Sequence, residues 1–277
     1  MSELYSLVSQ AITSASDQAI VPRFRSLTSS AIIEKAPGDW VTDADHECEA
    51  LLTNALHRID PGVPVIGEES VAADASLTYN AHEHARVWVL DPVDGTKSFI
   101  DGSPDFATMV ALVEDNTVTA SWIWQPIHGR MFTAVRGGGA FDNGRPLVAG
   151  VPLSDDKSSW RGVLRTRMMP DDLRAAAIEG FDAAGLPHIH VPAAGVVYPM
   201  AAAGELTHAL YWRTLPWDHA PGTLLAEEAG LTVARLDGSD YRPWDARFGV
   251  LSAASPSIWD AVRSALPPGL PDAADAG

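Results

Sequence analysis

The sequence predicts an α/β protein of the α+β kind, with an antiparallel sheet in its N-terminal half and a mixed sheet in its C-terminal half. Between residues 106 and 147, apolar runs are separated by turn signals such as Asn143-Gly144, which is typical of successive antiparallel strands. After about residue 150, strand-like and helix-like segments alternate, which indicates a mixed or parallel sheet. We therefore expect an N-terminal half over residues 1–150 and a C-terminal half over residues 151–270.

Composition and charge limit the class of protein. The 277 residues include 46% apolar and 20% charged residues, an ordinary globular mixture that can bury a substantial core. A net charge of -17 without a Lys/Arg cluster argues against a nucleic-acid or membrane partner. The single cysteine, Cys48, excludes an intrachain disulfide, and no signal peptide is recognised, so we expect a cytoplasmic protein. Residues 271–277 have no large apolar side chain and are expected to fray.

The N-terminal half begins with two predicted helices. Apolar residues recur at helical spacing from Leu4 to Ala19, and we expect a helix over about residues 3–28. The second helix follows Thr42 and ends at Pro61-Gly62. The apolar run "VPVI" (63–66) and the segment "RVWVL" (86–90), which is apolar from Val87, come next and are expected to form strands.

The C-terminal half alternates between three predicted strands and three predicted helices. The strands are expected at residues 162–169, 188–193 and 207–213. The helices are expected at 170–185, 195–205 and 217–230, and Gly230 closes the last of them.

Two carboxylates stand at the mouth of a buried strand. In "VWVLDPVDGTKSF" (87–99), Asp91 and Asp94 follow the apolar run, and Gly95-Thr96 marks a helix start. Carboxylates bind hard cations, and the free N–H groups of a helix start attract an anion such as phosphate. The stretch is therefore typical of a site that holds Mg²⁺ beside a phosphate, although an Asp-x-x-Asp pair alone is common in surface loops.

Three further carboxylates lie in matching contexts, and each also has a purely structural interpretation. Asp45 could complete a capping box with Thr42. Glu68 could be a solvated turn residue, and Asp218 could be a helix N-cap. The functional hypothesis therefore depends on the whole set and on no single member.

Together these stretches resemble the inositol monophosphatase family of metal-dependent phosphatases, part of the fructose-1,6-bisphosphatase/inositol phosphatase superfamily. The resemblance runs from about residue 3 to 265 and is carried, in the family's order, by "KAPGDWVTDAD" (35–45), "GEES" (67–70), "DPVDGTKSF" (91–99), "GAFDNG" (139–144) and "WDHAPG" (217–222). It implies a layered αβαβα sandwich of the sugar-phosphatase type, and a homodimer.

The resemblance also implies a site with two or three Mg²⁺ ions. Glu68, Asp91 and the backbone carbonyl of Val93 are the implied ligands of the first ion. Asp91, Asp94 and Asp218 are implied for the second, with Asp91 bridging and with Li⁺ as a competitor. A third, weaker ion is implied near Glu68.

Catalytic roles follow from the same resemblance. The backbone N–H groups of Gly95 and Thr96 would hold the phosphate. Asp45 and Thr96 would form a hydrogen bond and orient the attacking water, with Glu68 as a further catalytic residue. Lys35 matches the family's lysine near the metals. Such chemistry needs no cysteine or histidine nucleophile.

The substrate is less defined. In family members that prefer inositol phosphates, a glutamate lies seven residues before the metal-binding aspartate, where this chain has Tyr211. Tyrosine cannot mimic a carboxylate, so inositol 1-phosphate is in doubt. Arg165, Arg167, Tyr211 and Arg213 are candidates for reading the leaving group, since arginine binds phosphate or carboxylate, although they could equally be surface charges. Pro221 replaces the family's small residue, which a first helical turn would tolerate.

We therefore expect Mg²⁺-dependent hydrolysis of a small phosphorylated metabolite, a phosphate monoester of the inositol or sugar phosphate type, by an activated water. Histidinol phosphate, fructose 1,6-bisphosphate and a 3'(2'),5'-bisphosphate nucleotide stay open as alternative substrates. A non-catalytic protein that binds a phosphorylated metabolite is the alternative from another class. The intact motif positions favour the enzyme.

Overall fold

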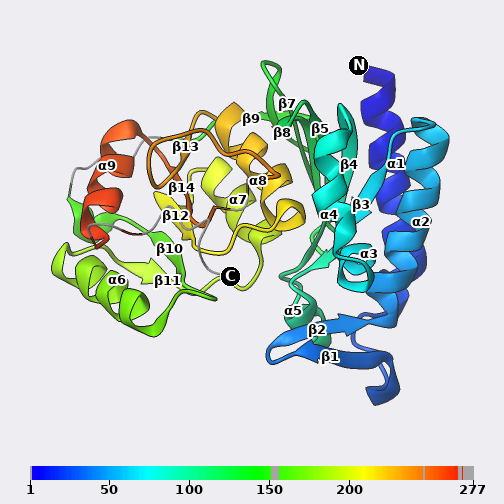
Figure 1. Cartoon of the computed structure of the whole chain (residues 1–277), viewed down its shortest axis with the longest axis horizontal. Coiled ribbons are helices and arrows are strands. Elements are labelled where there is room, and N and C mark those ends of the chain that lie inside the picture. The colour runs from blue at the N-terminus through cyan, green and yellow to red at the C-terminus, as the bar shows by residue number, and fades with distance from the viewer. Residues whose placement is uncertain (1, 151–155, 246, 268–269, 271–277) are drawn as a thin grey trace.

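A computed structural model describes residues 2–150, 156–245, 247–267 and 270, and their elements stack in alternating layers (Figure 1). Helices α1 (Ser2–Ala19) and α2 (Asp43–Ile59) cover one face of a seven-stranded sheet. The next layers are helices α7 (Ala194–Ala202) and α8 (Pro216–Glu228), a five-stranded sheet, and helices α6 (Asp171–Ala183) and α9 (Pro256–Ala265). The layered αβαβα sandwich expected from the sequence is confirmed.

The seven-stranded sheet runs in chain order, with one parallel pair at its start. Its strands are β3 (Val65–Gly67), β4 (Arg86–Asp94), β5 (Ala107–Glu114), β6 (Thr117–Gln125), β7 (Arg130–Val135), β8 (Gly139–Asp142) and β9 (Arg145–Leu147). Strands β3 and β4 are parallel, and every later neighbour is antiparallel. The predicted antiparallel succession over residues 106–147 is therefore confirmed.

The five-stranded sheet is mixed, as the alternating pattern predicts. Its order is β11 (His188–Ile189), β10 (Gly162–Arg165), β12 (His208–Tyr211), β14 (Val250–Ala253) and β13 (Thr232–Arg235). The first three strands are parallel, whereas β14 is antiparallel to both of its neighbours. Strands β13 and β14 and helix α9 were not among the predicted elements. The predicted boundary between the halves and the predicted frayed tail fall at 151–155 and 271–277, outside the described residues.

Alternate residues of the central strands face different helix layers. Val87 and Val89 of β4 belong to the core around α7 and α8, whereas Trp88 and Leu90 belong to the core beneath α1 and α2. All four side chains are buried, which explains why the sequence is apolar without interruption from Val87 to Leu90. Strand β4 is therefore covered on both faces, by α7 and α8 on one side and by α1 and α2 on the other.

Short elements at the edge of the large sheet carry several motif residues. They are the hairpin of β1 (Ile32–Ala36) and β2 (Asp39–Thr42) and the helices α3 (Glu68–Ala73), α4 (Ser76–Asn80) and α5 (Thr96–Ile100). Among the described residues, no helix is both long and apolar enough to span a membrane.

The first helix is shorter than the predicted 3–28. It ends at Ala19, and a 3₁₀ turn follows at Val21–Arg23. Pro22 has no N–H to donate to the carbonyl of Gln18, and its ring disfavours a helical conformation at Val21. The apolar spacing alone had suggested a continuation that this proline prevents.

Candidate active site

A β-bulge places Asp91 and Asp94 on the same face of the large sheet. Strand β4 continues through both aspartates, beyond the predicted end at Leu90. In its pairing with β5, Asp91 lies opposite Met109 and Asp94 lies opposite Ala107, so β4 contains one residue more than its partner. Residues three apart on a regular strand face opposite sides, and the extra residue removes that difference. Both carboxylates therefore face the layer of α7 and α8.

Glu68 is the first residue of α3 and is held from two sides. The buried carboxylate of Glu49, on α2, accepts hydrogen bonds from the backbone N–H groups of Glu69 at 2.9 Å and Ser70 at 2.7 Å. Lys35 Nζ lies 3.0 Å from Glu68 Oε1 and 3.0 Å from Glu69 Oε1. The start of α3 is thereby fixed against α2 and the β1–β2 hairpin, and Glu68 is aimed at the end of β4.

Asp218 lies in the first turn of α8, where it is an acidic residue near a helix N-terminus. It is not the N-cap, which is Leu215. One carboxylate oxygen each of Glu68, Asp91 and Asp218 lies within 4.8 Å of the others. Three elements that are distant in the sequence, β4, α3 and α8, thus bring their carboxylates to one point.

The environment of this group disfavours free carboxylates. Burial raises the pKa of Asp91 well above its ordinary value, and repulsion by Glu68, Asp94 and Asp218 raises it further. Burial raises the pKa of Asp218 well above its ordinary value, and repulsion by Asp94 and Glu68 raises it further. The donors are all oxygen atoms, the ligands that Mg²⁺ prefers. The group therefore fits a divalent cation, which would offset the repulsion among its members.

Asp94 also contacts helix α7, which the sequence did not indicate. Its Oδ2 accepts a hydrogen bond from the backbone N–H of Gly195, at the start of α7, at 2.5 Å. A Cβ atom at Gly195 would lie 2.6 Å from Ala107 Cβ and 3.1 Å from Asp94 Oδ2, so only glycine allows this approach. Burial raises the pKa of Asp94 to about 6, although the N–H groups of α7 act in the opposite direction.

Asp45 and Thr96 meet as expected. Thr96 Oγ1 lies 3.3 Å from Asp45 Oδ1 and 3.0 Å from the carbonyl oxygen of Val93. Asp45 also completes the capping box of α2, since its Oδ2 accepts from the N–H and hydroxyl of Thr42 at 2.8 and 2.6 Å. Burial raises the pKa of Asp45 to about 7, and Glu69 and Glu68 add to the effect. Asp45 therefore forms the expected capping box and still has one oxygen directed at Thr96.

Gly95 forms the turn between β4 and α5. Its φ of 88° lies in the left-handed region, and a Cβ there would lie 2.9 Å from Ala193 Cβ. The turn brings the start of α5 directly after the aspartates, so Gly95 and Thr96 line the same cavity as the carboxylates.

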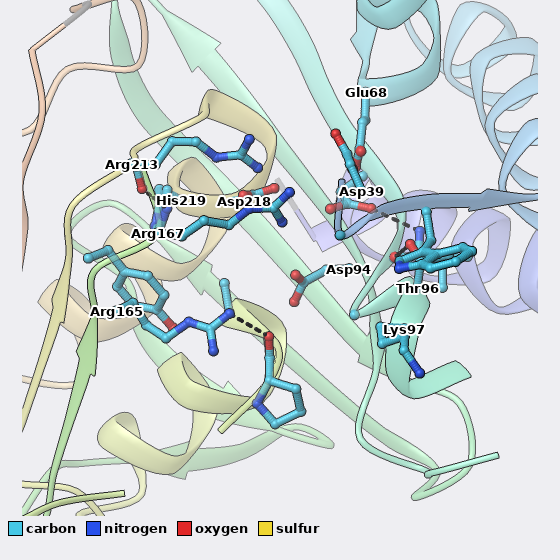
Figure 2. Close-up of a pocket in the computed structure, with 18 of the residues that line it drawn as sticks. Asp39, Glu68, Asp94, Thr96, Lys97, Arg165, Arg167, Arg213, Asp218 and His219 are labelled. Carbon is cyan, nitrogen blue, oxygen red and sulfur yellow. Dashed lines mark hydrogen bonds between the residues drawn. The ribbon is translucent and has the colours of Figure 1, made fainter. Parts of the chain in front are cut away.

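The cavity has a volume of about 290 Å³ and walls of opposite charge. Figure 2 shows carboxylates and α5 residues on one side and arginines on the other, with Asp94 and Asp218 between them. All the predicted metal, phosphate and substrate residues line this cavity: Glu68, Asp91, Val93, Asp94, Gly95, Thr96, Arg165, Arg167, Tyr211, Arg213 and Asp218. Asp45 and Lys35 lie behind it and contact it through Thr96 and Glu68.

Several cavity residues were missed by sequence reasoning. Asp39, Lys97 and His219 line the cavity and lie inside the motifs "KAPGDWVTDAD", "DPVDGTKSF" and "WDHAPG". The motifs themselves were therefore the available signal. His190 also lines the cavity, and only the fold reveals its position.

Comparison with known proteins agrees with this geometry. The inositol monophosphatase family matches residues 1–266 of the sequence. The chain belongs to the inositol monophosphatase family. It is accordingly a member of a family of phosphatases.

Two inositol-1-monophosphatases illustrate the relationship within the family. The protein of Mycobacterium leprae is 34% identical over 239 residues, which are 84% of this chain and 80% of that protein. The protein of Mesorhizobium japonicum is 33% identical over 214 residues, 74% and 75% of the two chains.

Solved structures show the same fold. Inositol monophosphatase II of Staphylococcus aureus aligns with a TM-score of 0.80 at 21% identity and covers 97% of this chain and 95% of its own. The extragenic suppressor protein suhB of Bartonella henselae aligns with a TM-score of 0.78 at 24% identity, with 95% and 98% covered.

One departure from the inositol monophosphatase family motif needs a corrected explanation. Pro221 does not lie in the first turn of its helix, because α8 begins at Pro216. It lies in the second turn, where it removes one backbone donor from a buried segment. The helix continues past it to Glu228, and Asp218 keeps its place in the first turn.

Proposed function

We propose that the chain is a Mg²⁺-dependent phosphatase of small phosphate monoesters. Glu68, Asp91 and the Val93 carbonyl would hold one ion, and Asp91, Asp94 and Asp218 a second, with a third near Glu68. The observation that carries the proposal is the meeting of Glu68, Asp91 and Asp218 within 4.8 Å. When bound, Mg²⁺ supplies charge neutralisation of the phosphate and acidification of the attacking water.

The chain's own residues would orient that water. Thr96 Oγ1 can accept a hydrogen bond from it while directing its own proton to Asp45 Oδ1, 3.3 Å away. The pKa of Asp45, raised to about 7, suits a base that works near neutral pH. Glu68 would assist from the opposite side, and Lys35 would keep Glu68 in position through their 3.0 Å contact.

The turn at Gly95 would hold the phosphate. Backbone N–H groups at the start of α5 favour an anion, and Gly95 has no side chain to obstruct it. Because this turn directly follows Asp94, phosphate and cations would be held side by side.

The physiological ester is not indicated by the family alone. Relatives named inositol-1-monophosphatase support an inositol phosphate. Tyr211 argues against it, because its phenol replaces the expected carboxylate. The family likeness also supports a homodimer and inhibition by Li⁺, and the single cysteine is compatible with a cytoplasmic location.

The test is phosphate release from a panel of esters, with Mg²⁺ and with a chelator. The panel contains inositol 1-phosphate, histidinol phosphate, fructose 1,6-bisphosphate, adenosine 3',5'-bisphosphate, NADP and glycerol 2-phosphate. We expect Mg²⁺-dependent release from at least one ester and none with chelator. Mg²⁺ binding without release from any ester would favour a non-catalytic binding protein.

A further inference from the structure

The carboxyl ends of two neighbouring parallel strands present cationic side chains to the cavity. Strands β10 and β12 pair so that Arg165 lies opposite Tyr211. Arg167 and Arg213 each follow two residues later, in the turns just beyond the ends of β10 and β12. All four residues line the cavity. We call Arg165, Arg167, Tyr211 and Arg213 the arginine wall, and Figure 2 shows its three arginines.

Hydrogen bonds to backbone carbonyl groups position two residues of the wall, Arg165 and Arg213. The guanidinium of Arg165 donates to the carbonyl oxygens of Val191 at 3.3 Å and Pro192 at 3.2 Å. Arg213 is fixed through its carbonyl oxygen, 3.0 Å from His219 Nε2. A carbonyl only accepts, so Nε2 carries the proton, and Nδ1 accepts from the hydroxyl of Tyr198 at 3.0 Å. The neutral ring agrees with burial lowering the pKa of His219 to about 3.

The polar groups of the wall lack partners of the kind they prefer. In the part of the chain that the structure describes, Arg165, Arg167 and Arg213 form no ion pair with a carboxylate, whereas Arg130 and Arg136 do. The Tyr211 side chain is buried, with 7% exposed, and its hydroxyl has no hydrogen-bond partner among the described residues. In a protein of net charge -17, three such arginines in one cavity indicate a binding site for an anion.

Asp94 and Asp218 lie near these arginines and attract them, but they form no ion pair with them. They belong to the proposed metal site, and ions bound there would offset their charge. An uncharged polyol would leave guanidinium groups partly desolvated without an oxyanion. An oxyanion would instead meet planar, charged donors and the Tyr211 hydroxyl.

We propose that the arginine wall binds a second oxyanion, a phosphate or a carboxylate, on the leaving group, so that the preferred substrate is anionic at both ends. The inference rests on the proposed phosphatase function and narrows its substrate class. One anionic end would lie at the Gly95 turn beside the carboxylates, and the other at the wall formed by β10 and β12.

The test compares esters that differ only in the second anion. Fructose 1,6-bisphosphate is paired with fructose 1-phosphate, and 2-phosphoglycerate with glycerol 2-phosphate, so that the pairs distinguish phosphate from carboxylate. We expect kcat/KM for the doubly anionic member of at least one pair to be about 10–100-fold higher, since a charge-assisted hydrogen bond contributes on that scale. Equal kcat/KM within both pairs would overturn the inference.

The substitutions Arg167→Gln and Arg213→Gln test whether these two arginines cause the preference for the doubly anionic ester. Each substitution should reduce the preference within the pair, measured as the ratio of the two kcat/KM values, by about tenfold. Arg213→Lys should retain part of it, because charge remains while the planar fork is lost. The control is Arg174→Gln on α6, a surface arginine paired with Asp171, which should leave the ratio unchanged. An unchanged ratio in both glutamine variants would contradict the inference.

Failure of the inference is distinguishable from failure of the proposed function. If singly anionic esters are hydrolysed and the arginine variants leave the ratio unchanged, only the inference fails. If no ester is hydrolysed, the proposed function fails, and calorimetric binding of fructose 1,6-bisphosphate still tests the wall. That binding should then weaken about tenfold in Arg167→Gln, and unaltered or absent binding would overturn the inference.

Discussion

Single residues of the site serve both the fold and the proposed chemistry. Asp45 uses one oxygen to cap α2 through Thr42 and turns the other towards Thr96. Asp91 accepts from the N–H of Val93 at 2.9 Å, which stabilises the bulged turn, while one of its oxygens joins the group with Glu68 and Asp218. A carboxylate has two oxygens, so a structural contact does not prevent a functional one.

Asp91→Asn should abolish Mg²⁺-dependent phosphate release. The amide keeps the shape of the side chain but removes the charge at the centre of the group, and we expect at least about a 10³-fold lower kcat. Asp182→Asn, an exposed position on α6, is the control for loss of one acid. Near wild-type release by a folded Asp91→Asn protein would contradict the assignment of Asp91 as a shared ligand.

Asp45→Asn should change the pH profile as well as the rate. A base whose pKa is about 7 must lose its proton to act, so kcat/KM of the wild type should fall below neutral pH. The variant should lose about 10²-fold in kcat, and at Mg²⁺ concentrations that saturate the site at every pH tested it should also lose the acid limb of the profile. Asp43→Asn, an exposed acid of the same helical turn, should show the wild-type profile. If the limb persists in Asp45→Asn, another group is the base.

At the scale of elements, Glu68 depends on the packing of α3 against α2. Glu49 reaches from α2 and accepts the first free N–H groups of α3, which also stabilises a helix N-terminus. A Cβ at Gly67 would lie 2.3 Å from Glu49 Cδ, so Gly67 is needed for this close approach. Glu49 is thus a positioning residue that acts through the helix start.

Glu49→Gln should weaken Mg²⁺ binding more than it lowers the maximal rate. The amide NH₂ would face a backbone donor, so α3 would shift and carry Glu68 with it. We expect about a tenfold higher Mg²⁺ concentration for half-maximal activity. Glu47→Gln on the same helix removes an exposed carboxylate paired with Arg23 and should leave this concentration unchanged. Equal effects of the two substitutions would show that Glu49 has no positioning role.

At the scale of the whole molecule, the cavity lies between elements that contribute side chains of opposite charge. The large sheet and α3 supply most of the carboxylates, whereas β10 and β12 supply the arginines, and α8 brings Asp218 between them (Figure 2). Burial of acids without a cation should reduce stability. The pKa values of Asp45 and Asp94 are raised to about 7 and about 6, so the folded protein holds protons that the unfolded chain releases. The free energy of unfolding without metal should therefore fall as pH rises from about 4 to 7.

Added Mg²⁺ should offset this loss where the acids are ionised. At a Mg²⁺ concentration about 100-fold above Kd, binding adds about 2.7 kcal/mol, or roughly 5–10 °C in Tm for a chain of this size. We expect that gain at pH 8 and a much smaller one at pH 5, measured by thermal unfolding at constant ionic strength. Asp91→Asn should show little gain at either pH. Equal gains for the wild type at both pH values would contradict the linkage to buried carboxylates.

The sequence by itself determined the motifs and most of the elements, although not β13, β14 and α9. The centre of β4, from Val87 to Leu90, is apolar because both faces of the strand are buried. Helix α2 begins at a capping box formed within residues 42–45. The metal, phosphate and water-orienting candidates were all recognisable because they lie in short, contiguous stretches such as "DPVDGTKSF". Such local patterns are set by backbone geometry and by the burial of neighbouring residues.

Only the tertiary structure decided which of these stretches meet and which way their side chains face. The bulge that turns Asp94 to the side of Asp91 arises from pairing with β5, and the contact of Asp94 with Gly195 joins residues 101 positions apart. The arginine wall exists because β10 and β12, separated by α6, β11 and α7, become neighbours in the mixed sheet. Strand order and register are settled by packing between distant segments, and no local pattern contains that information.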